Sequence, residues 1–452
     1  MHLFGGAAGG QREMNVSTMR AFIKRTALIG VGYLCAAGAI AADSTVNAKS
    51  TYSLKALYDD SWQRQPEAKA FASRLESMQA QQKVSQSYAP RPPTLEIGGK
   101  GEKSQSGGLA AGGAGEFIAG VSIPLWLWGE RSGSIALADA EATRLIRQQA
   151  GAQLKIAAQL RMQFWELELA KIDVTLARSR LQNARSLASD VARRYKAGDL
   201  SKADLFQAES TVSSAEGAQA DAKANLILAV QNLKALTGKS LDIESLVAGS
   251  KPSTAALSGL SEKLPKLPQS FADLDSSHPM IQELIAQVEV ASKATELARA
   301  QTRQNPELQI YGTSGRPEVG VPIQQTLMLG LKIPFGSDAR VQAQTLASKA
   351  NQIDAEERLA YEKQRLLAEL DGAKARVETS RIRQDAAVRR AKLTAETRAF
   401  FDKSFKFGET DLPTRLRIEQ DAVDAARQAA QAEIGYYAAI SALHQALGLL
   451  PQ

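Results

Sequence analysis

The sequence contains few of the residues from which catalytic and metal sites are usually built. Its 452 residues include one cysteine and three histidines, and no two histidines are close enough in sequence to share one turn of a helix. No phosphate-binding loop of the Gly-x-x-x-x-Gly-Lys type occurs. Without a thiolate pair, a histidine pair or a Ser/His/Asp grouping, the sequence predicts a protein that is not an enzyme and has no cofactor or metal.

Aromatic residues, excess charge and long apolar runs are also scarce. Aromatics make up 6% of the chain, while alanine, glutamine and leucine recur, a mixture that favours long, closely packed helices. The net charge of +7 is too small and too dispersed to indicate nucleic-acid binding. After the N-terminal region no stretch is apolar over the roughly 20 residues of a membrane helix. A membrane role would therefore have to use strands.

Residues 1–42 have the pattern of a secretion signal. A basic region is followed by an uncharged run over residues 26–40 and by a small-x-small cleavage pattern, Ala39-Ile40-Ala41. A membrane anchor is the alternative, but the run is shorter than the roughly 20 residues of a span. Leu34 stands before Cys35 where a lipoprotein site needs a small residue, so we expect no lipidation there. Cleavage would leave a mature chain without cysteine.

The rest of the chain consists of two similar halves. Prolines 66 and 93 recur 213 residues later at 279 and 306. Three further landmarks recur after 210 residues: Ile123-Pro124, Tyr195-Lys196-Ala197-Gly198-Asp199 and Gly238 correspond to Ile333-Pro334, Phe405-Lys406-Phe407-Gly408-Glu409 and Gly448. The period is too long for a solenoid, so it indicates an internal duplication. We expect a first repeat over residues 43–238, a linking segment over 239–277 and a second repeat over 278–452.

Each repeat is predicted to contain a helix, a strand pair and a long helical hairpin. The strand pairs fall within 94–125 and 306–334, with individual strands at 94–102, 116–125, 308–312 and 326–333. Apolar residues alternate with mostly small or polar ones. For example, Leu327, Leu329 and Leu331 share one face, and Thr326, Gly330 and Lys332 share the other with Met328. Such strands suit a sheet between lipid and water, and equally a half-buried hairpin of a soluble protein. Lengths near 9–11 residues match a tilted membrane strand.

The helical hairpins are predicted at residues 132–237 and 339–447. Residues 132–196 contain no proline, and as one helix they would reach on the order of 100 Å. Apolar residues follow the 4-3 spacing of a coiled-coil seam. In the first hairpin these include Ala170, Val174, Leu181, Val191, Ala208, Ala215, Leu226 and Leu233, and in the last helix Ala422, Ala425, Ala439 and Leu443. In the long helix of the second repeat, Thr394 and Arg398 interrupt the seam.

The turns inside the two hairpins are built alike. Gly198 and Gly408 stand where the end of a helix needs a positive φ. Ser201 and Asp204 resemble a capping box with aspartate in place of glutamate. Thr410 or Asp411 is the candidate cap of the last helix. We therefore expect two similar hairpin tips.

The order of these motifs resembles the outer-membrane efflux protein family, of which TolC is the best-known member. The resemblance runs from residue 52 to residue 450. It is carried by the segments Gln65-Pro66-Glu67, Tyr195-Lys196-Ala197-Gly198-Asp199-Leu200, Leu205-Phe206-Gln207-Ala208-Glu209, Asn305-Pro306, Ile333-Pro334-Phe335-Gly336 and Phe407-Gly408-Glu409-Thr410-Asp411-Leu412. The stretch from Gly408 to Arg417 looks most like the heavy-metal efflux branch.

The resemblance implies a mainly α fold with a membrane β-barrel. Three protomers, each with four strands, would close a 12-stranded barrel in the outer membrane on top of a periplasmic α-helical tube. Residues 239–277 would form an equatorial belt. The implied function is a passive exit channel of a tripartite efflux system for heavy-metal cations or drugs, with a periplasmic membrane-fusion adaptor and an inner-membrane pump of RND type as partners. Nucleic acid is not among the partners.

The resemblance also assigns functions to the tips. The adaptor would contact Gly198, Asp199, Leu200, Gly408, Glu409, Thr410 and Asp411. Some relatives carry pore-facing acids about two turns after the second glycine, where this chain has Thr414 and Arg417. The candidate gate residues are therefore Asp204, Glu409, Asp411, Thr414 and Arg417. The alternatives are a soluble periplasmic coiled-coil scaffold or adaptor, and the outer-membrane duct of a type I protein secretion system.

Overall fold

The computed structural model describes residues 53–101, 115–248, 262–267, 277–316, 321–336 and 338–451. They all belong to the compact unit Tyr52–Gln452. The expected secretion signal, residues 1–42, and Cys35 lie outside the described residues. Of the expected belt at 239–277, the description covers residues 239–248, 262–267 and 277.

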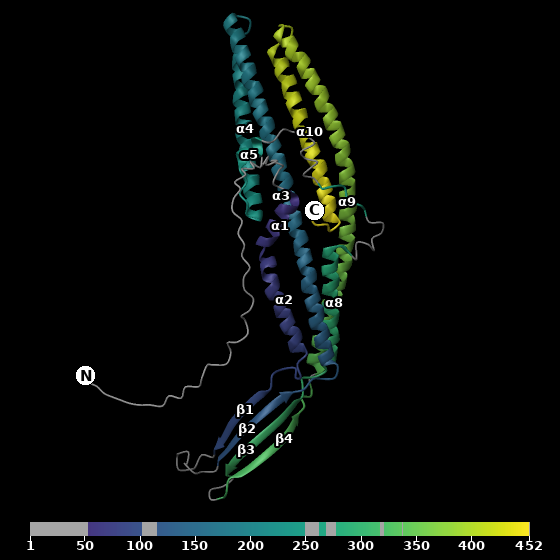
Figure 1. Cartoon of the computed structure of the whole chain (residues 1–452). Helices are drawn as coiled ribbons and strands as arrows, with labels where there is room; N and C mark the ends of the chain where they lie inside the picture. Colours follow the sequence, from purple (N-terminus) through teal and green to yellow (C-terminus); the bar gives the residue numbers. More distant parts are fainter. Residues whose placement is uncertain are drawn as a thin grey trace, which may run out of the picture. The chain divides into compact units, whose positions relative to one another are not determined.

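The described elements follow the same order in both halves of the chain (Figure 1). The first half contains α1 (Leu54–Arg64), α2 (Pro66–Ser85), β1 (Thr94–Gly101), β2 (Gly115–Pro124), α3 (Glu130–Ala197) and α4 (Lys202–Thr237). A short helix, α5 (Ile243–Ala248), follows. The second half contains α8 (Pro279–Ala300), β3 (Glu307–Arg316), β4 (Gln324–Lys332), α9 (Asp338–Lys406) and α10 (Leu412–Ala446). The mainly helical fold with two strand pairs is confirmed.

Two elements differ from the sequence prediction. The helix α1 was not expected as a separate element, although Ser53 caps it by accepting a hydrogen bond from the backbone N–H of Ala56. Strand β3 ends at Arg316 instead of residue 312. It extends further because Thr313–Arg316 pair with the first residues of β2, Gly115–Ile118, and this pairing depends on the other half of the chain.

The four strands form one antiparallel sheet in the order β1-β2-β3-β4. The central pair joins the two halves of the chain, since β2 belongs to the first and β3 to the second. A hydrogen bond of 2.7 Å from the N–H of Leu125 to the carbonyl of Pro306 continues this pairing beyond the strands. The helices that follow β2 and β4 are α3 and α9, so the sheet fixes where both long helices begin (Figure 1).

The hairpin helices pack in the order α4-α3-α10-α9, and α8 packs against both α3 and α9. The predicted seam of the first hairpin is buried, including Val174, Leu181, Val191, Ala208, Ala215 and Leu233. It merges with a core around Leu160, Phe164 and Trp165. Alanines in the seam let the helix backbones approach closely.

The helix α9 is much less buried than its counterpart α3. Among its described residues only Leu366, Leu370, Ala373 and Phe405 are buried. Several large apolar side chains of α9 are exposed: Leu346, Ile353, Tyr361, Ile382, Leu393 and Phe400. The described part of one chain therefore does not cover the outer side of this helix.

A buried ion pair fastens residues 262–267 to the helices. The guanidinium of Arg161 on α3 donates to both carboxylate oxygens of Glu262 at 3.0 and 2.5 Å and to the side-chain oxygen of Gln445 on α10 at 2.7 Å. Both charged side chains are only 4% exposed. One residue further, the ring of His444 is bonded to the carbonyl of Lys263. This part of the expected belt therefore lies against helices of both halves.

At the start of α8, His278 is 1% exposed and packs beneath Gly448. Neither ring nitrogen has a hydrogen-bond partner among the described residues. Burial lowers the pKa of His278 from its ordinary value of 6.5 to about 4. The ring is therefore neutral in the folded protein at neutral pH.

His278 should make the protein less stable in acid. Between pH 6.5 and about 4 the unfolded chain binds a proton at this residue and the folded chain does not. Stability should fall across this window by up to about 3 kcal/mol per protomer. Substituting His278→Leu should remove this part of the pH dependence without loss of a hydrogen bond. Denaturation midpoints of both proteins from pH 8 to pH 4 measure it, and identical pH profiles would contradict the assignment.

Candidate functional site

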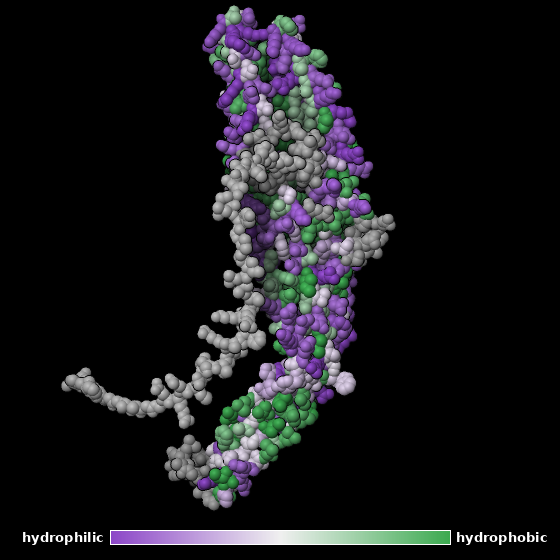
Figure 2. All heavy atoms as spheres, viewed as in Figure 1, coloured by the Kyte–Doolittle hydropathy of each residue, from purple (hydrophilic) through white to green (hydrophobic). Residues whose placement is uncertain are grey.

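One face of the sheet is apolar and open to the surroundings. The register places Leu95, Val121, Ile310 and Leu329 side by side across the four strands, and Ile123, Leu308 and Leu331 form a second row. Leu327 and Leu329 are 79% and 72% exposed. The strands appear as a continuous hydrophobic patch in the space-filling view (Figure 2). Full burial of a leucine side chain stabilises a protein by roughly 1.5–3 kcal/mol relative to exposure in water. This face would therefore be more stable in contact with an apolar environment than in water.

The opposite face of the same sheet is mostly polar. It carries Thr94, Glu96, Ser122, Glu307, Gln309, Tyr311, Thr313, Thr326 and Lys332, with Ile118 and Met328 as apolar members. Glu307 accepts a hydrogen bond from the hydroxyl of Ser122 at 3.2 Å and is paired with Lys332 at 3.3 Å. The alternation predicted from the sequence is therefore present in the folded sheet.

The outer edges of the sheet are available for pairing. Strands β1 and β4 each have one neighbour, and within the described ranges no strand pairs with their outer edges. Both edge strands are exposed along their lengths. A strand edge with free N–H and carbonyl groups is a template for pairing with another chain.

Exposed aromatic side chains lie where the sheet meets the helices. Trp128 follows β2 and is 99% exposed, and Phe335 follows β4 and is 94% exposed. The next residue in each case is a glycine with a φ of 79°, Gly129 and Gly336. The two junctions are thus built alike and each presents an aromatic ring to the surroundings.

The two hairpin tips have the same backbone hydrogen bonds. Gly198 has a φ of 85° and Gly408 a φ of 80°. The N–H groups of Asp199 and Glu409 donate to the carbonyls of Arg194 and Ser404, at 2.9 and 3.0 Å. This is the Schellman arrangement that closes the C-terminal end of a helix. Both glycines are required because their φ values are strained for residues with a Cβ atom.

The helices that leave the tips are capped differently. The capping box of α4 is complete, since Asp204 N–H donates to the hydroxyl of Ser201 and Ser201 N–H donates to the carboxylate of Asp204. Asp411 occupies the N-cap position of α10 but its side chain makes no capping hydrogen bond. Thr410 bonds instead to the hydroxyl of Ser404 at 2.6 Å. The predicted cap at Ser201 is confirmed. Asp411, one of the two predicted candidates, is the N-cap residue of α10 although its side chain makes no capping hydrogen bond, and Thr410 bonds back to α9.

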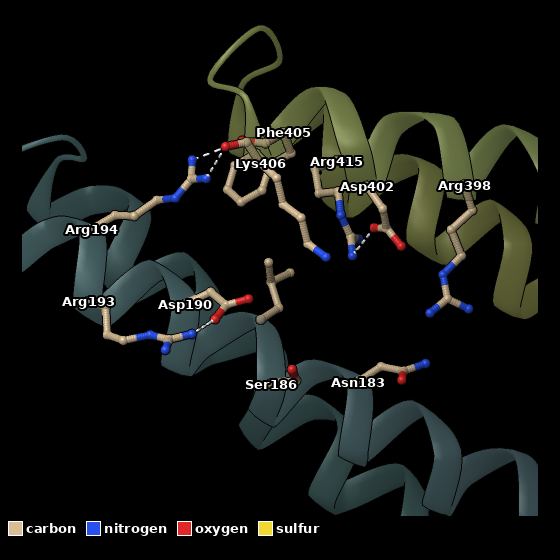
Figure 3. A pocket seen from close by; sticks show the side chains of 11 residues that line it. Asn183, Ser186, Asp190, Arg193, Arg194, Arg398, Asp402, Phe405, Lys406 and Arg415 are labelled. Carbon is tan, nitrogen blue, oxygen red and sulfur yellow. Dashed lines mark hydrogen bonds and ion pairs between the residues drawn. The ribbon is translucent and has the colours of Figure 1, made fainter.

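A cavity of about 470 Å³ lies between the tip regions of α3, α9 and α10 (Figure 3). Its charged lining residues are Asp190, Arg193, Arg194, Arg398, Asp402, Lys406 and Arg415. Arg194 donates to the carbonyls of Phe405 and Lys406 at 2.9 and 2.7 Å and lies over the ring of Phe405. A cation at these carbonyls offsets the negative end of the α9 dipole. Arg194 thereby links the first hairpin to the end of α9.

Two classes of feature are missing from the described part of the chain. No three His, Cys, Asp or Glu side chains within it are grouped as metal ligands. None of its helices combines the length and hydrophobicity needed to cross a membrane.

Residues 57–239 match the model of the family described as outer membrane efflux protein. Over these residues the chain is similar to the outer membrane efflux protein family. The match covers most of the first half of the chain, from α1 to the end of α4. The predicted resemblance to this family is confirmed over these residues. No curated protein matches the sequence significantly.

Solved channel structures share the fold. A structure of CusC matches with a TM-score of 0.73 at 16% identity and covers 88% of this chain and 92% of that one. The CmeC outer membrane channel of Campylobacter jejuni matches at 0.67 and 16%, over 87% and 85% of the two chains. The open-state MtrE outer membrane channel of Neisseria gonorrhoeae matches at 0.69 and 17%, over 88% and 89%. At these identities the likeness concerns the fold.

In the structure the predicted tip residues fall into two groups, one at each hairpin. Gly198, Asp199 and Leu200 form the turn between α3 and α4, and Gly408 to Asp411 form the turn between α9 and α10. Among the candidate gate residues, Asp204 is held in its cap, while Glu409, Asp411 and Arg417 are exposed. Sequence analysis did not single out Arg194, whose only signal is a basic residue in the last turn of α3.

Alanine at the tip glycine should destabilise the protein, whereas alanine within a helix should not. Gly408→Ala forces a positive φ on a residue with a Cβ atom, at a cost of about 1–2 kcal/mol. Gly217→Ala in the middle of α4 is the matched control, because the added Cβ meets nothing within 4 Å. It should stabilise by roughly 0.5–1 kcal/mol. Unfolding midpoints from helical circular dichroism measure both, and equal shifts would refute a strained tip.

Proposed function

We propose that this efflux protein is a homotrimeric, passive exit channel in the outer membrane. The observation that carries the proposal is the sheet, which has an exposed apolar face, a polar face and two free edges. Three copies joined edge to edge would give a 12-stranded barrel with the apolar face toward lipid and the polar face toward a water-filled lumen. Closure also removes every unpaired edge, which lipid does not tolerate.

Exposed aromatics at the junctions support the same placement. Trp128 and Phe335 directly follow strands whose outward residues are apolar. Aromatic rings are enriched at the boundary between lipid and water. The junctions would therefore lie at the periplasmic surface of the outer membrane, and the hairpins α3–α4 and α9–α10 would extend into the periplasm.

The helices supply a second argument for three copies. In the order α4-α3-α10-α9, the two outer helices each have one side without a neighbour in the described chain. On α9 this side carries exposed leucine, isoleucine and aromatic residues with spacings of seven, including Leu346 with Ile353 and Leu393 with Phe400. Such spacing is typical of a helix seam. The next protomer would cover it with its α4, in parallel with the pairing of β4 and β1.

The hairpin tips are the proposed docking surface for a periplasmic adaptor, which would connect the channel to an inner-membrane pump of RND type. Energy would come from the pump, and the cargo would be a heavy-metal cation or a drug. The similar structures of CusC, CmeC and MtrE are those of channels, which supports the channel itself. The duct of a type I protein secretion system is the alternative cargo assignment.

A soluble periplasmic scaffold is the second candidate function, and it would also use the long hairpins. It would have to leave Leu327, Leu329 and Leu331 in water or bury them against another protein. Each such side chain is worth roughly 1.5–3 kcal/mol when buried. The free edges together with the apolar face favour the membrane channel.

Membrane fractionation with native mass measurement tests the channel. We expect the protein in the outer membrane at three times the protomer mass after extraction in mild detergent. Asp substitution of an outward strand residue, Leu329→Asp, should block insertion, because a charge on the lipid face costs a few kcal/mol near the midplane. Thr326→Asp on the polar face is the matched control and should insert. A soluble monomer would put the scaffold first.

The gate assignment is tested by ion selectivity. Lysine in place of Glu409 and Asp411 should shift the preference of the channel toward anions, because both carboxylates are exposed at the tip. Asp385→Lys, at an exposed position of α9 away from the tip, should change it less. Reversal potentials in planar bilayers provide the measurement. If the tip variants conduct and select as the wild type does, these acids are not at the pore.

A further inference from the structure

Tyr311 lies across two neighbouring strands on the polar face of the sheet. It belongs to β3, and the register places it in one row with Gly120 of β2 and Glu96 of β1. Its hydroxyl donates a hydrogen bond of 2.7 Å to the carboxylate of Glu96. The side chain thus spans the whole width of β2 and is anchored on the strand beyond it.

The ring is held against the backbone of Gly120. A Cβ atom at position 120 would lie 2.0 Å from Cδ1 and 2.6 Å from Cε1 of Tyr311. Gly120 is buried although Glu96, its partner on the edge strand, is exposed, and the ring of Tyr311 lies over it. Glycine weakens a strand unless another group approaches its backbone closely. Here the tyrosine ring is that group.

We propose that Gly120 and Glu96 are positioning residues that hold Tyr311 flat on the wall and thereby set the width of the exit lumen. This inference rests on the proposed channel, in which the polar face lines the lumen. In the trimer three such rings occupy one level. A ring released from the wall would project its phenol toward the axis at each of three places, so the same residue can widen or narrow the pore depending on how it is held.

The residues at positions 96 and 120 have the properties that are needed to hold the Tyr311 ring on the sheet. The ring needs an acceptor on β1 and a free backbone on β2, and the chain supplies Glu96 and Gly120 at these positions. Gly330, on the same face of β4, is not covered in this way, since a Cβ atom there would meet only ordinary contacts at 3.8 and 3.9 Å with Gln309. It provides a control that adds the same methyl group to the same face.

Single-channel conductance of trimers extracted from the outer membrane tests the proposal. Gly120→Ala should lower the conductance, because the added methyl displaces the ring from the wall. The double variant Gly120→Ala/Tyr311→Ala should restore it to the wild-type value or above, and Gly330→Ala should leave it unchanged. Tyr311→Ala alone should change it little, because the ring already lies on the wall. If Gly120→Ala lowers the conductance only because it damages the sheet, the double variant should not restore the conductance.

The nearby backbone oxygen of Ile310, 2.8 Å from the added Cβ, could prevent assembly of Gly120→Ala. In that case Glu96→Ala serves instead, since it removes the anchor without adding an atom. It should give a lower and noisier conductance that Tyr311→Ala suppresses. Assembled trimers that conduct like the wild type with Glu96 or Gly120 replaced would overturn the inference and leave the channel intact. Absence of wild-type trimers or of any conductance would overturn the channel itself.

Discussion

Hydrogen bonding along the outer edges of β1 and β4 is the constraint on which the rest of this structure depends. Four strands are too few to close on themselves, so two rows of N–H and carbonyl groups have no partner in the described chain. An apolar face favours contact with lipid, and in lipid an unpaired N–H or carbonyl group costs more free energy than in water, because no water can hydrate it. Pairing of these edges between protomers, as proposed above, would answer both demands.

The helices, like the sheet, have a side that the described chain leaves uncovered. The first hairpin is packed tightly, with buried alanines and leucines along its seam, while α9 keeps most of its apolar residues exposed. In a protein that functions as a monomer, we would expect the apolar residues of α9 to be buried like those of α3. The difference between the two hairpins is explained if α9 lies at the boundary with the next protomer, as β4 does in the sheet.

Polar groups hold the two halves of the chain at defined levels. Near the middle of α3, Arg161 joins Glu262 and Gln445 in a buried network, and near the tip Arg194 binds the last carbonyls of α9. Between these levels the polar contacts from α3 to α10 range from the buried hydrogen bond of Trp165 to Ser441 to the exposed pair of Asp173 with Arg427. Exposed pairs of this kind contribute little stability. The two hairpins are therefore joined chiefly by the buried network and, near the tips, by the apolar cluster of Val191, Phe405 and Leu412.

Much of the fold followed from the sequence because the signals were local or repeated. The alternation in the strands and the 4-3 spacing of the helices depend on neighbours a few residues apart, and the period of 210 to 213 residues repeats the same landmarks in both halves. The tip glycines were predictable because a positive φ strongly favours glycine. The separate helix α1 carried the same kind of signal, Ser53 before Leu54, Leu57 and Tyr58, and was overlooked.

Contacts between distant segments were decided only by the tertiary structure. The full length of β3 depends on β2, nearly two hundred residues earlier, and the ion pair of Arg161 with Glu262 joins segments that show no common pattern. The flat position of Tyr311 requires Gly120 and Glu96 from two other strands, so no property of its own surroundings in the sequence reveals it. The sequence by itself determined which residues face outward on each element, because that is a matter of periodicity. Which elements then meet, and at what register, depended on packing and hydrogen bonds that form only when the whole chain is folded.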